Sequence, residues 1–130
     1  MTRLYEAQKA VFQRLQTDEA LMSAINGIHD YVPDETNFPY IVFGRSYSEP
    51  YKTKTSIGER IELQIEIWSA TKGKEETINI IKLMEAALTE ELTVEDAFLI
   101  SQEVKSREVL EEAIDLFHGT IVFEILLDLE

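Results

Sequence analysis

A strict alternation of apolar and polar residues between positions 61 and 68 constrains the fold of this chain more than any other feature. Every second residue is isoleucine or leucine, and these residues are Ile61, Leu63, Ile65 and Ile67. The residues between them and after them are Glu62, Gln64, Glu66 and Trp68. A period of two is typical of a β-strand with one buried face. We therefore predict a long strand from about Glu59 to Ser69, in a sheet covered on one side.

A helix is predicted directly after this strand, over residues 74–88. Its apolar residues recur at helical spacing, and those expected in the core are Met84, Ala87, Leu88 and either Ile78 or Ile81. Thr71 is a side chain that can cap the first turn. Gly73 is expected to loosen the turn that precedes the helix.

Two helices are predicted near the N-terminus. Apolar residues at three- and four-residue spacing indicate an amphipathic helix from Thr2 to about Gln16. Thr17 can cap a second, shorter helix over residues 18–25, which we expect to stop at Gly27. The segment IHDYV at 28–32 then predicts a strand, and the polar residues 33–38 predict a loop.

The remaining strands are less regular. Residues 39–47, PYIVFGRSY, predict a strand, and residues 46–56 lack apolar alternation, so we interpret them as a long hairpin connection. Residues 97–107 predict a further strand, while 109–116 indicate either a helical turn or an excursion between strands. The last segment predicts a buried strand, because it alternates Ile121, Phe123, Ile125 and Leu127 with other residues.

These elements predict an α+β fold in a single domain of residues 1–130. We expect a mainly antiparallel sheet of four to five strands with two main helices packed on one face. Trp68, Val122 and Leu126 fall on the nominally polar side of their strands. An apolar group there predicts a subunit interface, unless the sheet curls enough to bury it.

Charge and composition exclude several classes of protein. The chain has 12 basic and 25 acidic residues and a net charge of -13, which argues against a nucleic-acid-binding surface. The excess of acid in residues 90–130 is interpreted either as a solvated surface or as a lining that DNA passes without sticking. No segment approaches the roughly 20 apolar residues that span a bilayer, and the N-terminus lacks a signal-peptide pattern. We therefore expect cytosolic synthesis and no membrane partner.

The sequence contains no recognisable catalytic, cofactor or metal site. There is no cysteine, and His29 and His118 stand outside any metal-ligand spacing. Adjacent acidic residues on a helix diverge by about 100° and do not converge as an acid/base pair would. The glycines are too isolated for a phosphate-binding loop. We predict that the protein is not an enzyme and has no cofactor and no metal.

One segment departs from the acidic trend. Residues 45–60, RSYSEPYKTKTSIGER, are rich in basic and aromatic side chains, and such a segment on an acidic body suits contact with the acidic edge of an identical neighbour. Together with the tryptophan of the following strand, the candidate interface residues are Arg45, Tyr47, Tyr51, Lys52, Lys54, Arg60 and Trp68. The alternative is an ordinary hairpin loop with incidental lysines.

The order of these elements resembles that of the tail-completion, or tail-to-head joining, proteins of long-tailed bacteriophages and prophages. The residues that carry the likeness are Pro39 to Gly44, Thr55 with Gly58 and Glu59, Ile61 to Ser69, and Gly73 with Glu76. The likeness covers nearly the whole chain, and its motifs are structural.

The resemblance implies a fold like that of tail terminators and a structural role without a catalytic motif. It also implies a ring of identical subunits, a hexamer, at the head-proximal end of the tail tube. The implied partners are the tail tube protein and the head connector or stopper, with DNA passing through the ring. Such a protein is made in the bacterial cytoplasm and ends in the virion tail. The alternatives are another neck or minor tail protein, a tail assembly factor, or a small bacterial binding domain.

Overall fold

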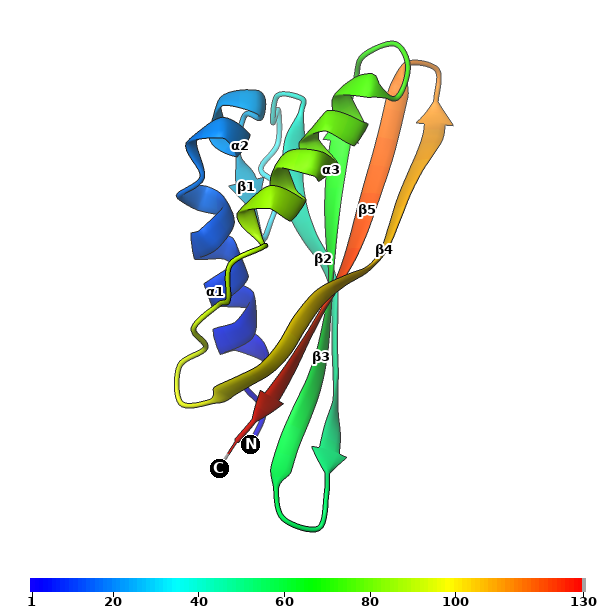
Figure 1. Cartoon of the computed structure of the whole chain (residues 1–130). Coiled ribbons are helices and arrows are strands. Elements are labelled where there is room, and N and C mark those ends of the chain that lie inside the picture. Colours follow the sequence, from blue (N-terminus) through cyan, green and yellow to red (C-terminus); the bar gives the residue numbers. More distant parts are fainter. Residues whose placement is uncertain (130) are drawn as a thin grey trace.

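The computed structural model describes residues 1–129, and a five-stranded sheet forms its centre (Figure 1). Strand order is β1-β2-β3-β5-β4; β1 is parallel to β2, and all other neighbours are antiparallel. The elements are α1 (Leu4–Gln16), α2 (Glu19–Ala24), β1 (Ile28–His29), β2 (Tyr40–Lys52), β3 (Ile57–Ser69), α3 (Glu75–Ala87), β4 (Phe98–Ala113) and β5 (Leu116–Asp128). The predicted α+β fold with a mainly antiparallel sheet is confirmed. Glu130, the last residue of the predicted domain, lies outside the described residues.

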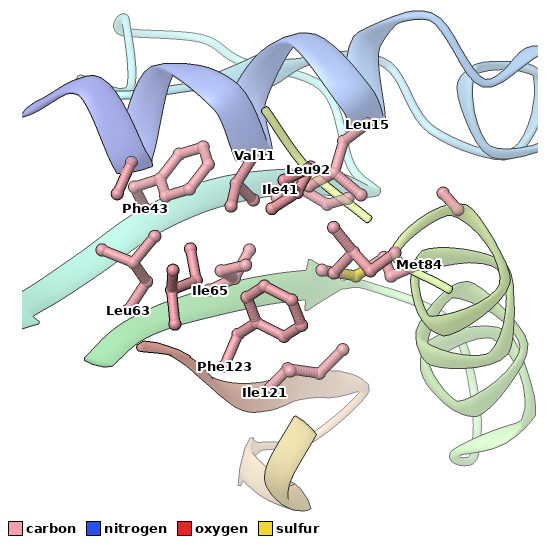
Figure 2. Close-up of a cluster of buried hydrophobic side chains, with 14 of the residues drawn as sticks. Val11, Leu15, Ile41, Phe43, Leu63, Ile65, Met84, Leu92, Ile121 and Phe123 are labelled. Carbon is pink, nitrogen blue, oxygen red and sulfur yellow. The ribbon is translucent and has the colours of Figure 1, made fainter. Parts of the chain in front are cut away.

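The helices cover one face of the sheet, as predicted (Figure 1). Figure 2 shows Val11 and Leu15 of α1 and Met84 of α3 lying with Ile65 of β3 and Phe123 of β5 in one buried cluster. Each of these side chains is almost completely removed from water. Burial of one such side chain contributes about 1.5–3 kcal/mol to folding, so the alternating faces of β3 and β5 anchor the domain.

The predicted caps near the N-terminus are off by a residue or more. Asp18, not Thr17, caps α2, because its carboxylate accepts a hydrogen bond from the Leu21 N–H at 2.9 Å. The Thr17 hydroxyl instead donates back to the Gln13 carbonyl at 3.0 Å. The helix also ends before Gly27, because Ile25 is already extended, with φ -131 and ψ 164.

The start of α3 differs from the prediction in a similar way. Lys74 occupies the N-cap position without a side-chain hydrogen bond, so the predicted cap by Thr71 is wrong. The Ser69 hydroxyl lies 3.2 Å from that of Thr71 and donates to Glu76 at 2.6 Å. Gly73 has φ +82, a conformation that glycine adopts without strain. Ile81 is buried and Ile78 is 43% exposed, which decides between the two core candidates.

Three strand predictions need correction. β1 has two residues instead of five. β2 continues through most of the predicted hairpin connection, which shrinks to a turn at residues 53–56 in which the Thr53 N–H donates to the Ser56 carbonyl. β4 continues through the predicted excursion at 109–116 and turns only at Ile114 and Asp115. The errors in β2 and β4 have one cause: β4, and the part of β2 beyond its short pairing with β1, lie at sheet edges, where backbone pairing continues although few side chains enter the core.

Candidate subunit interface

The distal parts of β2 and β3 form an arm, residues 46–60, that projects past the end of β5 and beyond the helices (Figure 1). Its backbone pairing runs from Ser46 opposite Leu63 to Lys52 opposite Ile57. A register shift between Phe43 and Ser46 precedes it. Such a bulge bends a strand and increases its twist, so it separates the arm from the part of β2 that enters the core.

Six of the seven predicted interface residues lie on the arm or at its base. Arg45 lies in the bulge at the base, and the other five lie on the arm itself. The Arg45 guanidinium lies 4.8 Å from the Tyr47 ring centre, and that of Arg60 lies 5.4 Å from the Tyr51 ring centre. Such cation–π contacts are worth about 0.5–1 kcal/mol at exposed sites. They arrange the two arginines and the two tyrosines as stacked pairs on the surface of the arm.

The cationic side chains of the arm differ in whether a carboxylate of the same subunit pairs with them. Arg60 lies 3.3 Å from a carboxylate oxygen of Glu49 and 3.5 Å from one of Glu124. Lys52 and Lys54 form no ion pair with the residues that the structure describes. The two lysines are therefore the cations of the arm that are available to a partner, whereas Arg60 is engaged by Glu49 of the arm and Glu124 of β5.

Tyr47 is tied to the same group of side chains. Its hydroxyl donates to Glu49 at 3.0 Å, and this hydrogen bond, reinforced by the carboxylate's charge, raises the pKa of Tyr47 above its ordinary value. The phenol O–H thus holds one carboxylate oxygen of Glu49, while the Arg60 guanidinium lies near the other. Glu49, one of the two acids in residues 45–60, thus links two of the candidate residues.

Glu59, the other acid of that segment, is not part of an exposed loop. It is buried, and its carboxylate accepts hydrogen bonds from the Thr2 hydroxyl and, at 2.7 Å, from the Arg3 N–H. Beside it, a Cβ on Gly58 would lie 2.6 Å from the Leu127 carbonyl oxygen. The N-terminus and β5 therefore fix the root of the arm at these two residues.

Trp68 is separate from the arm, at the opposite end of β3. Its ring stacks on that of His118 with centres 4.1 Å apart and planes at 4°. The two ring nitrogens of His118 lie 2.5 Å from Glu66 and 2.8 Å from Glu112. Sequence reasoning missed this cluster, because only the pairing of β3 with β5 brings Trp68 opposite His118.

The face of the sheet without helices collects acidic residues. Glu62 of β3 is directly opposite Glu124 of β5, which is opposite Glu103 of β4. Like charges at such positions destabilise a sheet by a few tenths of a kcal/mol up to about 1 kcal/mol. Arg60, near Glu124, and Lys105, 3.6 Å from Glu103, offset part of this repulsion.

The apolar residues predicted on this helix-free face are half-buried. Trp68 is covered in part by His118, while Val122 and Leu126 lie between the neighbouring strands of the same face. The sheet therefore does not curl far enough to bury them. An interface over this face stays a prediction.

Two other features bear on the function classes considered. Across residues 1–129, no group of three or more His, Asp or Glu side chains is arranged to hold a metal ion. No helix in this part of the chain is long and apolar enough to cross a membrane. The absence of enzymatic activity stays a prediction.

Comparison with known proteins gives a consistent result. The family described as tail completion protein gp17 matches residues 9–128. The tail completion protein gp17 of Bacillus phage SPP1 is 26% identical over 103 residues, covering 79% of this chain and 77% of that protein. The structure of the bacteriophage SPP1 gp17 protein matches with a TM-score of 0.63 and 26% identity, over 91% of this chain and 86% of that one.

A further structural match comes from the virion of a native gene transfer agent particle. It has a TM-score of 0.83 and covers 93% of both chains at 20% identity, so it shows the shared fold alone. The predicted relationship to phage tail-completion proteins is confirmed by the family match, which spans most of the sequence. The chain belongs to the tail completion protein gp17 family and is a structural protein of a phage-type tail.

Proposed function

We propose that the protein closes the head-proximal end of the tail tube as a ring of identical subunits, a hexamer, and joins the tail to the head connector. The observation that carries the proposal is the arm: among the described residues, its exposed Lys52 and Lys54 have no ion-pair partner, although the chain has a net charge of -13. Lys52 and Lys54 have no ion-pair partner among the described residues of their own subunit. An identical neighbour offers them an acidic surface. Family membership supports the station in the tail.

The ring forms through one repeated contact between different surfaces. Such a heterologous contact produces a closed ring when its rotation fits a whole number of copies. The interface residues proposed for it are those of the arm and its base, namely Arg45, Tyr47, Tyr51, Lys52, Lys54 and Arg60, with Trp68 on the helix-free face. Electrostatic complementarity of this kind speeds encounter and selects the partner and the register.

The remaining surfaces serve the other partners. One rim of the ring contacts the tail tube protein and the other contacts the head connector or stopper. The helix-free face, with its row of carboxylates, lines the channel, because an acidic wall repels the DNA phosphates and lets the duplex pass. Assembly takes place in the host cytoplasm, and the ring requires neither catalysis nor a cofactor.

Negative-stain electron microscopy of the protein mixed with its own tail tubes tests this proposal. We expect a cap at one tube end, and light scattering of the free protein gives its mass before assembly. The double substitution Lys52→Glu and Lys54→Glu should remove most caps. Lys72→Glu with Lys74→Glu, an equal charge change at exposed positions before α3, is the matched control and should leave them.

Two results would contradict the proposal in different ways. If the wild-type protein binds the isolated connector but never the tube, the protein belongs to another position in the neck. Caps that persist at normal number after the arm lysines are reversed would remove the arm from the interface while leaving the ring in place.

A further inference from the structure

A cavity of 350 Å³ lies at the root of the arm, where the hairpin meets the two ends of the chain. Its walls include apolar Met1, Pro50, Ile57 and Leu129, and the polar part of its lining is Thr2, Ser48, Lys52 and Glu59. Its acid, Glu59, already accepts two hydrogen bonds from the N-terminal segment. The cavity is thus a socket with apolar walls on part of its surface and a lysine in its lining, and about 150 Å³ is enough for a benzene-sized apolar group.

An exposed apolar side chain with acidic neighbours lies on the turn between β4 and β5. Ile114 at this turn is 91% exposed, the highest value for any isoleucine, leucine, valine or phenylalanine among the described residues. It is followed by Asp115 and preceded within three residues by Glu111 and Glu112. An isolated isoleucine in water loses the roughly 1.5–3 kcal/mol that its burial provides.

These two features lie at opposite ends of the sheet (Figure 1). They therefore cannot meet within one subunit. Their chemistry is nevertheless complementary, because the cavity has apolar walls and a lysine, while the turn carries an apolar side chain with acidic neighbours. We propose that the β4–β5 turn of one subunit inserts Ile114 into the arm-root cavity of the next subunit. This inference rests on the ring proposed above and identifies the surface that receives the arm.

The open edges of the sheet favour this contact over direct strand addition. The outer edge of the arm carries Pro50, which has no N–H to donate. The other edge strand, β4, has register shifts at three places along its length. Proline and bulges protect edge strands from pairing with other chains, so side chains at the turn and the socket make the contact instead.

The contact is heterologous and joins opposite ends of neighbouring subunits. In a closed ring the long axis of each sheet then follows the circumference. Lys52 and Lys54 approach Glu111 and Asp115 of the neighbouring copy around the inserted isoleucine. The arm and the turn, which lie at opposite ends of each sheet (Figure 1), thus form one interface.

Cysteine cross-linking tests this inference cleanly, because the chain contains no native cysteine. The test variant carries both Ile57→Cys and Ile114→Cys. When it is mixed with its tail tubes and treated with a short thiol cross-linker, it should give a ladder of covalent multimers. Ile78→Cys with Ile114→Cys is the matched control, because Ile78 is 43% exposed and Ile57 is 45% exposed. The control pair should give no ladder.

The outcomes separate this inference from the proposed function. Capped tubes without a ladder from the 57/114 pair would overturn the inserted turn and leave the ring standing. Absence of both caps and ladder, with wild-type protein also failing to cap, would overturn both.

A charge exchange provides a second, independent measurement. Lys52→Glu should weaken capping by about two- to five-fold per contact, and adding Glu111→Lys to the same chain should restore it. A Lys52→Glu chain that caps normally, or one that Glu111→Lys does not restore, would overturn the pairing between arm and turn.

Discussion

The covered half of the β2–β3 hairpin and its projecting arm belong to the same two strands but differ in how far their side chains are buried. Ile65 in the covered half is completely buried, whereas Ile57, in the same strand, is 45% exposed. Backbone pairing continues through both halves apart from the single bulge after Phe43. The difference teaches that a strand keeps its conformation beyond the core, where its side chains are free to serve recognition.

The physical reason is the reach of the helices. α1 and α3 cover the sheet only over the body of the domain (Figure 1), so apolar residues contribute burial energy there and not on the arm. The arm is held instead at its root, by Gly58 and Glu59. Stability and recognition are therefore separated along one hairpin, and substitutions in the two halves should have separable effects.

The largest effect is expected from removing a buried side chain of the covered half. Ile65→Ala should lower the free energy of unfolding by about 2–5 kcal/mol, from lost burial and the cavity left behind. Ile57→Ala on the arm, the matched control, should change it by about 0.5 kcal/mol or less. Urea denaturation followed by circular dichroism measures both, and equal losses would contradict the separation.

Next in size is a substitution at the boundary between the halves. Gly58→Ala places a Cβ against the backbone carbonyl of Leu127 at 2.6 Å, so backbone must shift, at a cost of about 1–3 kcal/mol. The control is Gly44→Ala, whose Cβ would first meet the end of the Glu66 side chain, which can turn away without a backbone shift at the expense of its contact with His118. Urea midpoints should fall further for Gly58→Ala, and the reverse order would contradict a fixed root.

A much smaller change in stability is expected from reversing the free cations of the arm. Lys52→Glu with Lys54→Glu should alter the free energy of unfolding by less than about 0.5 kcal/mol, because both side chains are solvated and unpaired. The same variant should lose tube capping. Thermal unfolding at matched salt checks the first part, and a strongly lowered melting temperature would show that the arm lysines stabilise the subunit itself.

The smallest effect concerns the ionisation of Tyr47. Its pKa is raised from 10.0 by the hydrogen bond to Glu49 and by that carboxylate's charge. The contact is therefore present below the ordinary tyrosine pKa and is lost as pH rises through the raised value. Ultraviolet titration, with Tyr47→Phe subtracted, should show a late transition that Glu49→Gln moves to lower pH. An unmoved transition would contradict this cause.

Much of the body was predictable because its burial is periodic. The alternation in β3 and β5 and the helical spacing in α1 and α3 predict these elements to within a few residues. Helix caps were less predictable, since Thr17 and Asp18 are both suitable caps and only the backbone decides between them.

The arm and β4 were not predictable by the same means, because polar edge strands show no period. Of the candidate site residues, Arg60 pairs largely within its own subunit, and Trp68 lies at the far end of the strand from the arm. Glu59 carries a charge in the sequence but is buried at the root of the arm. Composition alone does not distinguish a charge that faces a partner from one that holds the fold.

The sequence by itself determined which faces of β3 and β5 leave water, where α1 and α3 lie, and that the chain is strongly acidic. The tertiary structure decided which side chains meet: His118 contacts Glu66 across 52 residues of sequence, and Glu62 stands opposite Glu124. The reason is register. Alternation specifies which face of a strand is buried, but the pairing of distant strands decides which residues of the other face become neighbours.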